Sequence, residues 1–331
     1  SVMLPDGSIV LMGGYSSGYK NDVWRSTDQG ATWTQMTASA GWSARSYHTS
    51  VCLSDGSIVL MGGIKSGGFP GTRLNDVWLS TDNGATWTLL RSNAEWSDRN
   101  SHESIVLPDD SIMVMGGVGS GYQNDVWRST DGGVTWTQMT GSAGWSSRVN
   151  PSVVLLNDNS IVLSGGYTTS GRKNDVWRST DMGATWTEIT ASAEWSARDS
   201  HTSAVLPDGS IVLMGGDAGS NKNDVWRSTD QGATWNQMTA NAGWSARESH
   251  TSAVLPDGSI VLMGGDAGSI KNDVWRWETA SSYDQNPSHT YTDPGLYPVA
   301  LQVYNTDSYG KILKDAYITV QGAPVITSAE R

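Results

Sequence analysis

Short apolar segments that recur about every 50 residues dominate the pattern of hydrophobic and polar positions along the chain. In the unit that shows the pattern best, residues 201–206 and 210–216 are mainly apolar, and residues 223–229 and 234–238 alternate more between apolar and polar positions. Runs of this length predict β-strands, and the "PDGS" between the first two predicts a tight hairpin turn. Each unit is therefore expected to be a sheet of four antiparallel strands.

The unit returns six times along the chain. Double glycines at the end of the second strand begin at Gly13, Gly62, Gly116, Gly165, Gly215 and Gly264, and the tryptophans of the third strand are Trp24, Trp78, Trp127, Trp177, Trp226 and Trp275. The second strand is apolar at every position from 211 to 214, so neighbouring sheets must cover it on both faces. Six sheets that cover one another predict an all-β fold, a six-bladed β-propeller of four-stranded antiparallel blades over residues 1–280.

The turn between the third and fourth strands reads Ser-x-Asp-x-Gly-x-Thr-Trp in five of the six units. In the first copy, Asp28 can accept backbone N–H groups, Gly30 can adopt a positive φ, and Trp33 can pack under the turn. The aspartates are Asp28, Asp82, Asp131, Asp181 and Asp230, and the tryptophans are Trp33, Trp87, Trp136, Trp186 and Trp235. Carboxylates spread around a ring cannot converge on one ligand, so we interpret these turns as structural and predict neither a metal nor a cofactor.

Two family resemblances follow from these residues. The double glycines, the "NDVW" strands and an Arg-x-x-His step before the next unit resemble the kelch repeat over about residues 1–277. The Ser-x-Asp-x-Gly-x-Thr-Trp turn resembles the Asp-box, or BNR repeat, of sialidases and other secreted propellers. Both resemblances imply a β-propeller.

The order of the strands separates two faces of such a ring. The first and third turns lie on one face and hardly vary, whereas the second turns and the crossings between units lie on the other face and do vary. Variable loops on a repeated scaffold commonly carry recognition, so we expect a ligand on this variable-loop face. The aromatic side chains of its loops that we regard as candidate ligand contacts are Tyr19, Phe69 and Tyr122.

Each crossing carries a Trp-x-x-Arg step, and its arginines are Arg45, Arg99, Arg148, Arg198 and Arg247. In kelch proteins that bind acidic peptides, arginines at this step line the mouth of the ring, so the resemblance makes these five candidate ligand contacts. The alternative is that each arginine stacks on a tryptophan or binds carbonyl groups between units. An equivalent arginine for the first unit would precede Ser1, which suggests a piece of a larger protein.

Histidines follow three residues after most of these arginines, at His48, His102, His201 and His250, whereas the fourth unit has Pro151 instead. They resemble the kelch histidine that binds neighbouring backbone. Their spacing around the ring does not favour a zinc site.

Composition and charge exclude several functions. The net charge of −12 makes nucleic acid an unexpected partner, because phosphate binding needs an excess of Lys and Arg. The sequence has no apolar run of about 18 residues, so we predict no membrane span in this chain. Cys52 is the only cysteine, which excludes an internal disulfide framework.

The composition changes after residue 280, where tryptophan no longer occurs and tyrosine becomes frequent. Residues 286–310 and the following "KDAYITV" resemble the C-terminal half of a PKD domain, an Ig-like sandwich. We therefore expect a partial Ig-like β segment at residues 281–322 and a linker at 323–331. Half a sandwich is poorly stable alone, so this tail is expected to pack on the propeller, to complete its sixth blade or to pair with another chain.

The main alternative to a binding role is a sialidase-like glycoside hydrolase. Such an enzyme needs two suitably spaced carboxyl groups, or a tyrosine nucleophile with an acid partner. Sialidases also need an arginine cluster, and their "R-I-P"-like motif is absent here. Asp217 and Asp266, in equivalent loops of adjacent units, are the one pair that we consider, and we expect no catalytic residue.

We therefore expect a non-catalytic extracellular or cell-surface module for adhesion, scaffolding or binding. It would recognise a protein or a glycan through the variable-loop face. A structural subunit that self-associates through residues 281–331 is the second hypothesis, and the hydrolase is the third.

Overall fold

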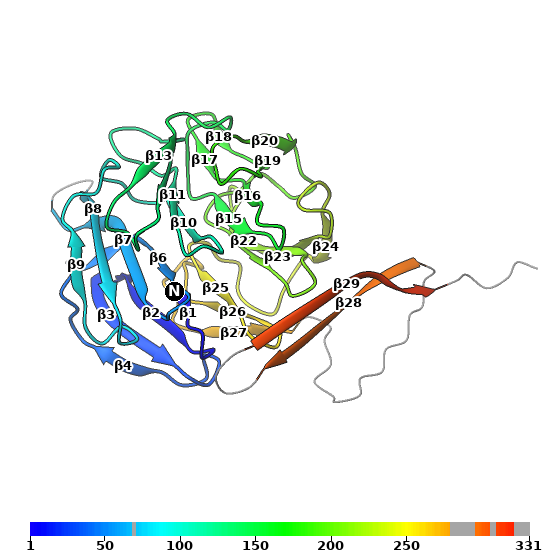
Figure 1. The fold of residues 1–331 in the computed structure, drawn as a ribbon, viewed down its shortest axis with the longest axis horizontal. Helices are drawn as coiled ribbons and strands as arrows, with labels where there is room; N and C mark the ends of the chain where they lie inside the picture. Colours follow the sequence, from blue (N-terminus) through cyan, green and yellow to red (C-terminus); the bar gives the residue numbers. More distant parts are fainter. Residues whose placement is uncertain (68–70, 279–294, 305–308, 321–331) are drawn as a thin grey trace, which may run out of the picture.

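The computed structural model describes residues 1–67, 71–278, 295–304 and 309–320. The described residues form strands β1–β29 and no helix, and so they include no helix of the length and hydropathy that crossing a membrane requires. Figure 1 shows the strands of residues 1–278 arranged around a centre, with the first and last of them side by side. The protein is thus all-β, as the sequence predicts.

One unit shows how the sheets are built. Strands β21 (Thr202–Val205), β22 (Ile211–Asp217), β23 (Asn221–Ser228) and β24 (Asn236–Thr239) pair in this order, each antiparallel to the next. The four strands predicted for this unit are confirmed, with boundaries that differ by a few residues. The register shifts near the double glycine of β22, where the left-handed backbone interrupts the ladder.

The other units repeat this order. The third and fourth units contain β10 (Glu103–Val106), β11 (Ile112–Met115), β12 (Val126–Ser129) and β13 (Thr137–Thr140), and β15 (Ser152–Leu155), β16 (Ile161–Ser164), β19 (Val176–Ser179) and β20 (Thr187–Thr190). The last unit has three paired strands among the described residues, β25 (Thr251–Val254), β26 (Ile260–Met263) and β27 (Val274–Trp277).

The first two units are joined into one nine-stranded sheet through the short strand β5 (Arg45–Ser46). They contain β1 (Val2–Met3), β2 (Ile9–Ser16), β3 (Gly18–Ser26) and β4 (Thr34–Thr37), and then β6 (Thr49–Cys52), β7 (Ile58–Lys65), β8 (Thr72–Ser80) and β9 (Thr88–Arg91). A small separate sheet of β14 (Arg148–Val149), β17 (Tyr167–Thr168) and β18 (Gly171–Arg172) lies in the loops of the fourth unit.

The hydrophobic core lies between neighbouring sheets, because strands that are apolar on both faces must be covered on both faces. Ile211, Val212, Leu213 and Met214 of β22 are all almost fully buried, and they belong alternately to the hydrophobic clusters on either side of their sheet. The innermost strands β1, β6, β10, β15, β21 and β25 lie beside one another in this order, and β1 also lies beside β25. Ile9 of β2 and Val261 of β26 belong to one hydrophobic cluster there, whereas no sheet of the described strands joins the first unit to the last.

The double glycines are required by close packing between neighbouring units. Gly215 has φ 58°, and a side chain at this position would lie 2.9 Å from the ring of His250 and 3.0 Å from the carbonyl oxygen of Arg247. Both groups belong to the segment that enters the next unit. Glycine therefore allows that segment to cross directly over the end of the second strand.

The tail contains β28 (Gly295–Tyr304) and β29 (Tyr309–Val320), which pair with each other in a two-stranded antiparallel sheet. Within the described residues β28 does not pair with β27, so the expectation that the tail completes the sheet of the last unit is not supported. The remainder of the predicted PKD-like segment, the predicted linker 323–331 and the candidate Phe69 lie outside the described residues.

Candidate functional site

The repeated aspartate turns form closed sets of hydrogen bonds. Asp28 accepts the backbone N–H of Thr32 at 2.8 Å, the Thr32 hydroxyl at 2.5 Å and the Ser26 hydroxyl at 2.8 Å. These bonds, above all the one from the Thr32 hydroxyl, lower the pKa of Asp28 to about 2. Trp33 Nε1 donates to the carbonyl oxygen of Gly30 at 3.0 Å, so the indole packs under its own turn.

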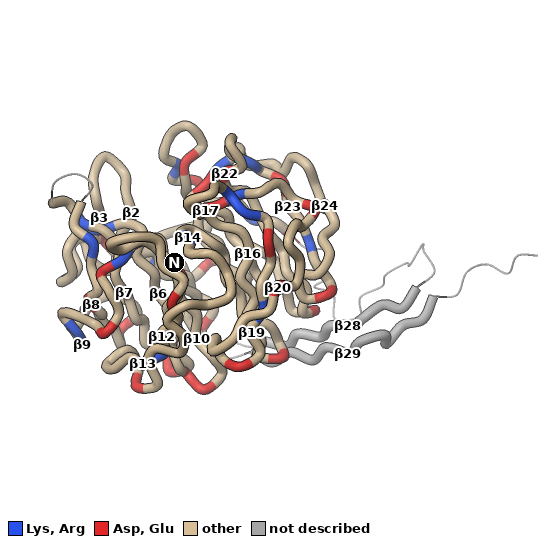
Figure 2. The backbone as a smooth tube through the Cα atoms, turned by 90° about the horizontal axis from the view of Figure 1, so that it is seen from above, with Lys and Arg blue, Asp and Glu red and all other residues tan. Residues whose placement is uncertain are grey.

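The other four turns have the same bonds, and Figure 2 shows acidic positions spaced along the lower edge of the ring. The structure places these turns apart from one another around that edge. Their carboxylates are occupied within each turn, and no group of metal-binding side chains occurs in the described part of the chain.

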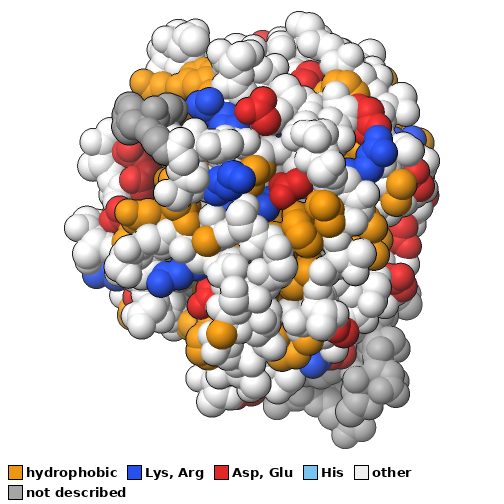
Figure 3. Space-filling model, turned by 90° about the vertical axis from the view of Figure 1, so that its left-hand side faces the viewer, with side chains coloured by type: hydrophobic (Ala, Val, Ile, Leu, Met, Phe, Trp, Pro, Cys, Tyr) orange, Lys and Arg blue, Asp and Glu red, His pale blue; other side chains and the backbone are white. Residues whose placement is uncertain are grey.

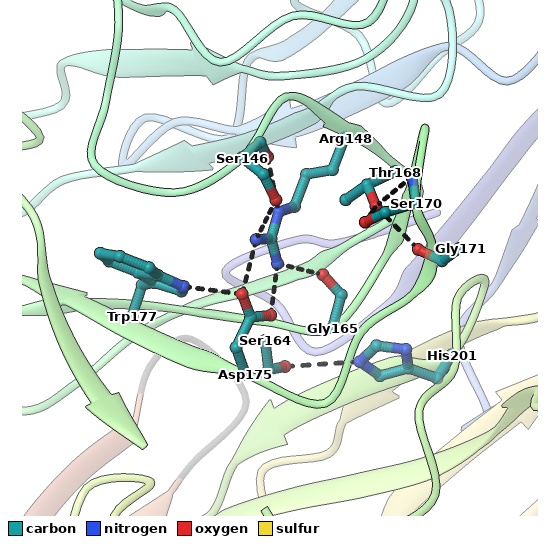
Figure 4. A network of polar contacts seen from close by, with 10 residues as sticks. All are labelled: Ser146, Arg148, Ser164, Gly165, Thr168, Ser170, Gly171, Asp175, Trp177 and His201. Atoms are coloured by element: carbon teal, nitrogen blue, oxygen red, sulfur yellow. Dashed lines mark hydrogen bonds and ion pairs between the residues drawn. The ribbon is translucent and has the colours of Figure 1, made fainter. Parts of the chain in front are cut away.

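The five crossing arginines lie inside the ring. In the network of Figure 4, Arg148 donates to both carboxylate oxygens of Asp175 at 2.7 Å and to the carbonyl oxygen of Gly165 at 2.7 Å. It also donates to the carbonyl and hydroxyl oxygens of Ser146, and its guanidinium lies 5.9 Å from the ring centre of Trp145. All five N–H donors of the guanidinium are therefore used.

The equivalent arginines have the same partners and the same burial. Arg45, Arg99, Arg148, Arg198 and Arg247 are all 0% exposed, and their aspartate partners are Asp76, Asp125, Asp175, Asp224 and Asp273. The expectation that these side chains contact a ligand at the mouth needs correction, because no guanidinium surface is accessible. Each arginine instead joins its crossing segment to the unit that follows.

The histidines are also part of the frame. His102 Nε2 lies 3.0 Å from the hydroxyl of Thr49 on the neighbouring inner strand, and His250 makes the same contact with Thr202 at 3.1 Å. Burial lowers the pKa of His48, His102, His201 and His250 to about 3, so all four are neutral at neutral pH. His102, His201 and His250 each contact a hydroxyl group of the unit that precedes them.

A chain of backbone hydrogen bonds surrounds the mouth of the ring on the variable-loop face. Its members are Tyr47, Ser101, Asn150, Ser200 and Ser249, all with positive φ between 48° and 58°. From Ser101 onward, each donates its backbone N–H to the carbonyl oxygen of the preceding member at 2.9–3.1 Å. Backbone hydrogen bonds thus link successive units around the mouth, and the side chains there differ from unit to unit.

Carboxylates gather on one side of this mouth, which we call the acidic rim: Asp199, Asp217, Glu248 and Asp266. The backbones of Asp199 and Asp217 are bridged, as are those of Glu248 and Asp266. Burial and then the three other carboxylates raise the pKa of Glu248, and burial raises that of Asp199. The negative charges of the rim therefore repel one another.

Among the described residues, one arginine faces this cluster. Arg172 lies 2.9 Å from Asp199 through Nε, forms an ion pair with Asp217, and stacks over the ring of Tyr167 at 5.6 Å. Asp217 is thus engaged by a cation, which does not favour its use with Asp266 as a catalytic pair. Reasoning from the sequence did not single out Arg172, because the second unit has Arg73 at the equivalent position and only the placement of the loops brings Arg172 to these carboxylates.

Tyrosines lie along the rest of the variable-loop face. Tyr122 packs edge-on against Tyr167 with ring centres 6.5 Å apart, and Tyr19 packs against Tyr15 at 5.3 Å. Tyr47, the first member of the chain of backbone hydrogen bonds around the mouth, is 50% exposed. Of the two described candidates, Tyr19 lies in β3, paired with Tyr15 of β2, and Tyr122 bridges Val118. Each packs against a tyrosine that the sequence did not reveal.

The side of the ring formed by units one and two offers no comparable arrangement. Figure 3 shows that hydrophobic side chains on the side of units one and two lie in small groups between polar and charged ones. Isolated groups of this kind are normal on protein surfaces. The mouth is accordingly the strongest candidate for binding.

Two family models match the chain. Residues 135–295 match the KLHDC2/KLHL20/DRC7 Kelch-repeats domain, and residues 57–187 match the DUF6242 beta propeller domain. A search of curated proteins found no match. Domains of these kinds generally mediate protein binding, which agrees with a non-catalytic binding module. On this evidence the chain contains a kelch-like β-propeller.

Proposed function

We propose that this protein is a non-catalytic, six-bladed propeller that acts outside the cell. We propose further that its acidic rim binds a basic segment of a partner protein. The six inner strands and the six hydrophobic clusters support the number of blades. The aspartate turns have the hydrogen bonds expected of Asp-boxes, which are common in secreted propellers. Their resemblance supports the extracellular location.

The single observation that carries the choice of ligand is the imbalance of charge at the mouth. Four carboxylates meet one guanidinium there among the described residues, and burial together with the other three carboxylates raises the pKa of Glu248. A lysine or arginine from a partner would relieve this repulsion and keep all four groups ionised. The net charge of −12 would in addition attract a basic partner over longer distances.

A glycan is the second candidate. The exposed ring of Tyr47 and the paired rings of Tyr122 and Tyr167 offer faces for sugar rings, while the acidic rim can accept hydrogen bonds from hydroxyl groups. This candidate needs no charge on the ligand. Its binding would therefore depend little on salt, whereas the binding of a basic segment would weaken as salt screens the charges.

The test compares a short peptide rich in Lys and Arg with an acidic peptide of equal length and with a glycan array. We expect the basic peptide to bind, and the substitutions Glu248→Gln and Asp266→Asn each to weaken binding several-fold. Glu188→Gln removes a carboxylate from the outer strand β20 and serves as the charge-matched control. Selective binding of a neutral glycan would favour the second candidate. Turnover of a fluorogenic glycoside that Asp217→Asn abolishes would overturn the non-catalytic assignment.

A further inference from the structure

Five junctions between neighbouring units are built in the same way. At the first, Asn21 Nδ2 donates to the carbonyl oxygens of Ala40 at 3.1 Å and Trp42 at 3.3 Å, and Arg45 pairs with Asp76 of the following unit. The amides of the other four junctions belong to Asn75, Asn124, Asn174 and Asn223. Each junction thus joins an asparagine, a Trp-x-x-Arg segment and an aspartate.

At the sixth junction, between the last unit and the first, the described residues supply the asparagine and the aspartate but no Trp-x-x-Arg segment. Asp22 is the equivalent of Asp76, yet among the described residues it has no arginine partner and accepts Trp24 Nε1 at 3.0 Å. Asn272 is the equivalent of Asn21, and it is exposed with no side-chain hydrogen bond to a described residue. We call this place the open junction.

No described residue forms a strand along the outer edge of the open junction either. In the first five units a fourth strand pairs with the third strand, but no described strand pairs with the outer edge of β27. Val274 of β27 is 37% exposed and Trp275 is 36% exposed. The equivalent valines are all 0% exposed: Val23, Val77, Val126, Val176 and Val225.

Tryptophan packing and backbone hydrogen bonds are also incomplete at the open junction among the described residues. Trp42 packs edge-on against Trp87 at 5.9 Å, and three further junctions repeat this pair, whereas Trp33 has no tryptophan partner among the described residues. The chain of bonds around the mouth also ends here. Within the described backbone, the Ser249 carbonyl accepts no N–H group and the Tyr47 N–H has no acceptor.

We propose that the open junction is a docking site for one further segment of the same chemistry, a β-strand followed by Trp-x-x-Arg. Its strand pairs with β27 and covers Val274, its carbonyl groups accept the Asn272 amide, and its tryptophan packs beside Trp33. Its arginine forms an ion pair with Asp22. The five occupied junctions identify this occupant, because each shows which side chains fill the equivalent space. The occupant need not come from a second copy of this chain, because the five Trp-x-x-Arg segments of a second copy are already bound at its own five junctions.

The test uses the complete 331-residue chain and a labelled peptide with the sequence of residues 34–47, which is the strand and crossing segment of the first unit. Fluorescence anisotropy measures binding. We expect saturable binding and a Tm that rises with peptide concentration. A peptide in which alanine replaces the arginine equivalent to Arg45 is expected to bind at least tenfold more weakly.

Variants of the protein locate the site. Asp22→Asn and Val274→Asp should each weaken binding of the unmodified peptide about tenfold, and Glu188→Gln, on the outer strand of another unit, should not. Circular dichroism verifies that each variant is folded. Equal binding of the two peptides, or unchanged binding to Asp22→Asn, would overturn the proposal. Concentration-dependent dimers that Asp22→Asn abolishes would assign the junction to a second copy and overturn it too.

Discussion

At the scale of single residues, the departures from the repeat are the most informative positions. Glu103 begins the inner strand β10 where Thr49, Thr202 and Thr251 begin the equivalent strands. Those threonines can meet the histidine of a following unit, but the unit after Glu103 has Pro151 at that position. Burial alone raises the pKa of Glu103 from 4.5 to about 8.

The raised pKa of Glu103 makes the stability of the folded protein depend on pH. Between pH 4.5 and about 8 the unfolded chain loses the Glu103 proton while the folded chain keeps it, so stability falls as the pH rises through this interval. Glu103→Gln should remove the effect and raise the Tm at pH 8 by about 3 °C or more. Scanning calorimetry at pH 4 is the internal control, because both proteins should melt alike there. A gain at pH 4 as large as that at pH 8 would contradict the assignment.

At the scale of elements, the turn between β19 and β20 contains an avoidable strain. Met182 has φ 56° and is 47% exposed, whereas Asn83 and Gly132 occupy the same place in other units. The left-handed region costs most L-residues about 1 kcal/mol, and asparagine tolerates it best among residues with a side chain. The turn itself is fixed by its aspartate bonds, so the strain is retained.

We therefore expect Met182→Asn to stabilise the protein by about 0.5–1 kcal/mol in urea unfolding. Met182→Val is the matched comparison, since a β-branched residue at positive φ should be destabilising. Equal stability of both variants would show that the turn tolerates any residue at this position.

The elements also show how far the sequence alone determines the structure. Two-sided apolar runs such as residues 211–214 and the Asp-Gly turns are local signals, and they predicted the strands and the all-β fold. The buried pairing of Arg148 with Asp175 was not predicted, because it joins residues that are distant in the sequence and depends on how neighbouring units pack. For the same reason the role of Arg172 at the mouth became visible only when the loops were placed together.

At the scale of the whole molecule, the buried histidines should determine how the ring responds to acid. Burial lowers the pKa of His48, His102, His201 and His250 from 6.5 to about 3. Between these values the unfolded chain binds protons that the folded chain does not, so stability falls as the pH decreases from 6.5 toward 3.

The free energy of unfolding should therefore fall steeply from pH 6 to pH 4, with an uptake of several protons. His201→Gln should reduce this uptake by about one proton, whatever its effect on absolute stability. The slope of the unfolding free energy against pH measures the uptake. An unchanged slope would mean that His201 gains its proton in the folded ring.

The arginine–aspartate pairs have a consequence for how such a chain can evolve. Because every pair links a crossing segment to the unit after it, an exchange of one whole unit for another preserves the chemistry of each link. Unequal recombination between the nearly identical gene segments could therefore alter single loops at the mouth without a compensating change elsewhere. Exchange of units could then diversify the ligand preference, while the geometry of the ring limits the number of units.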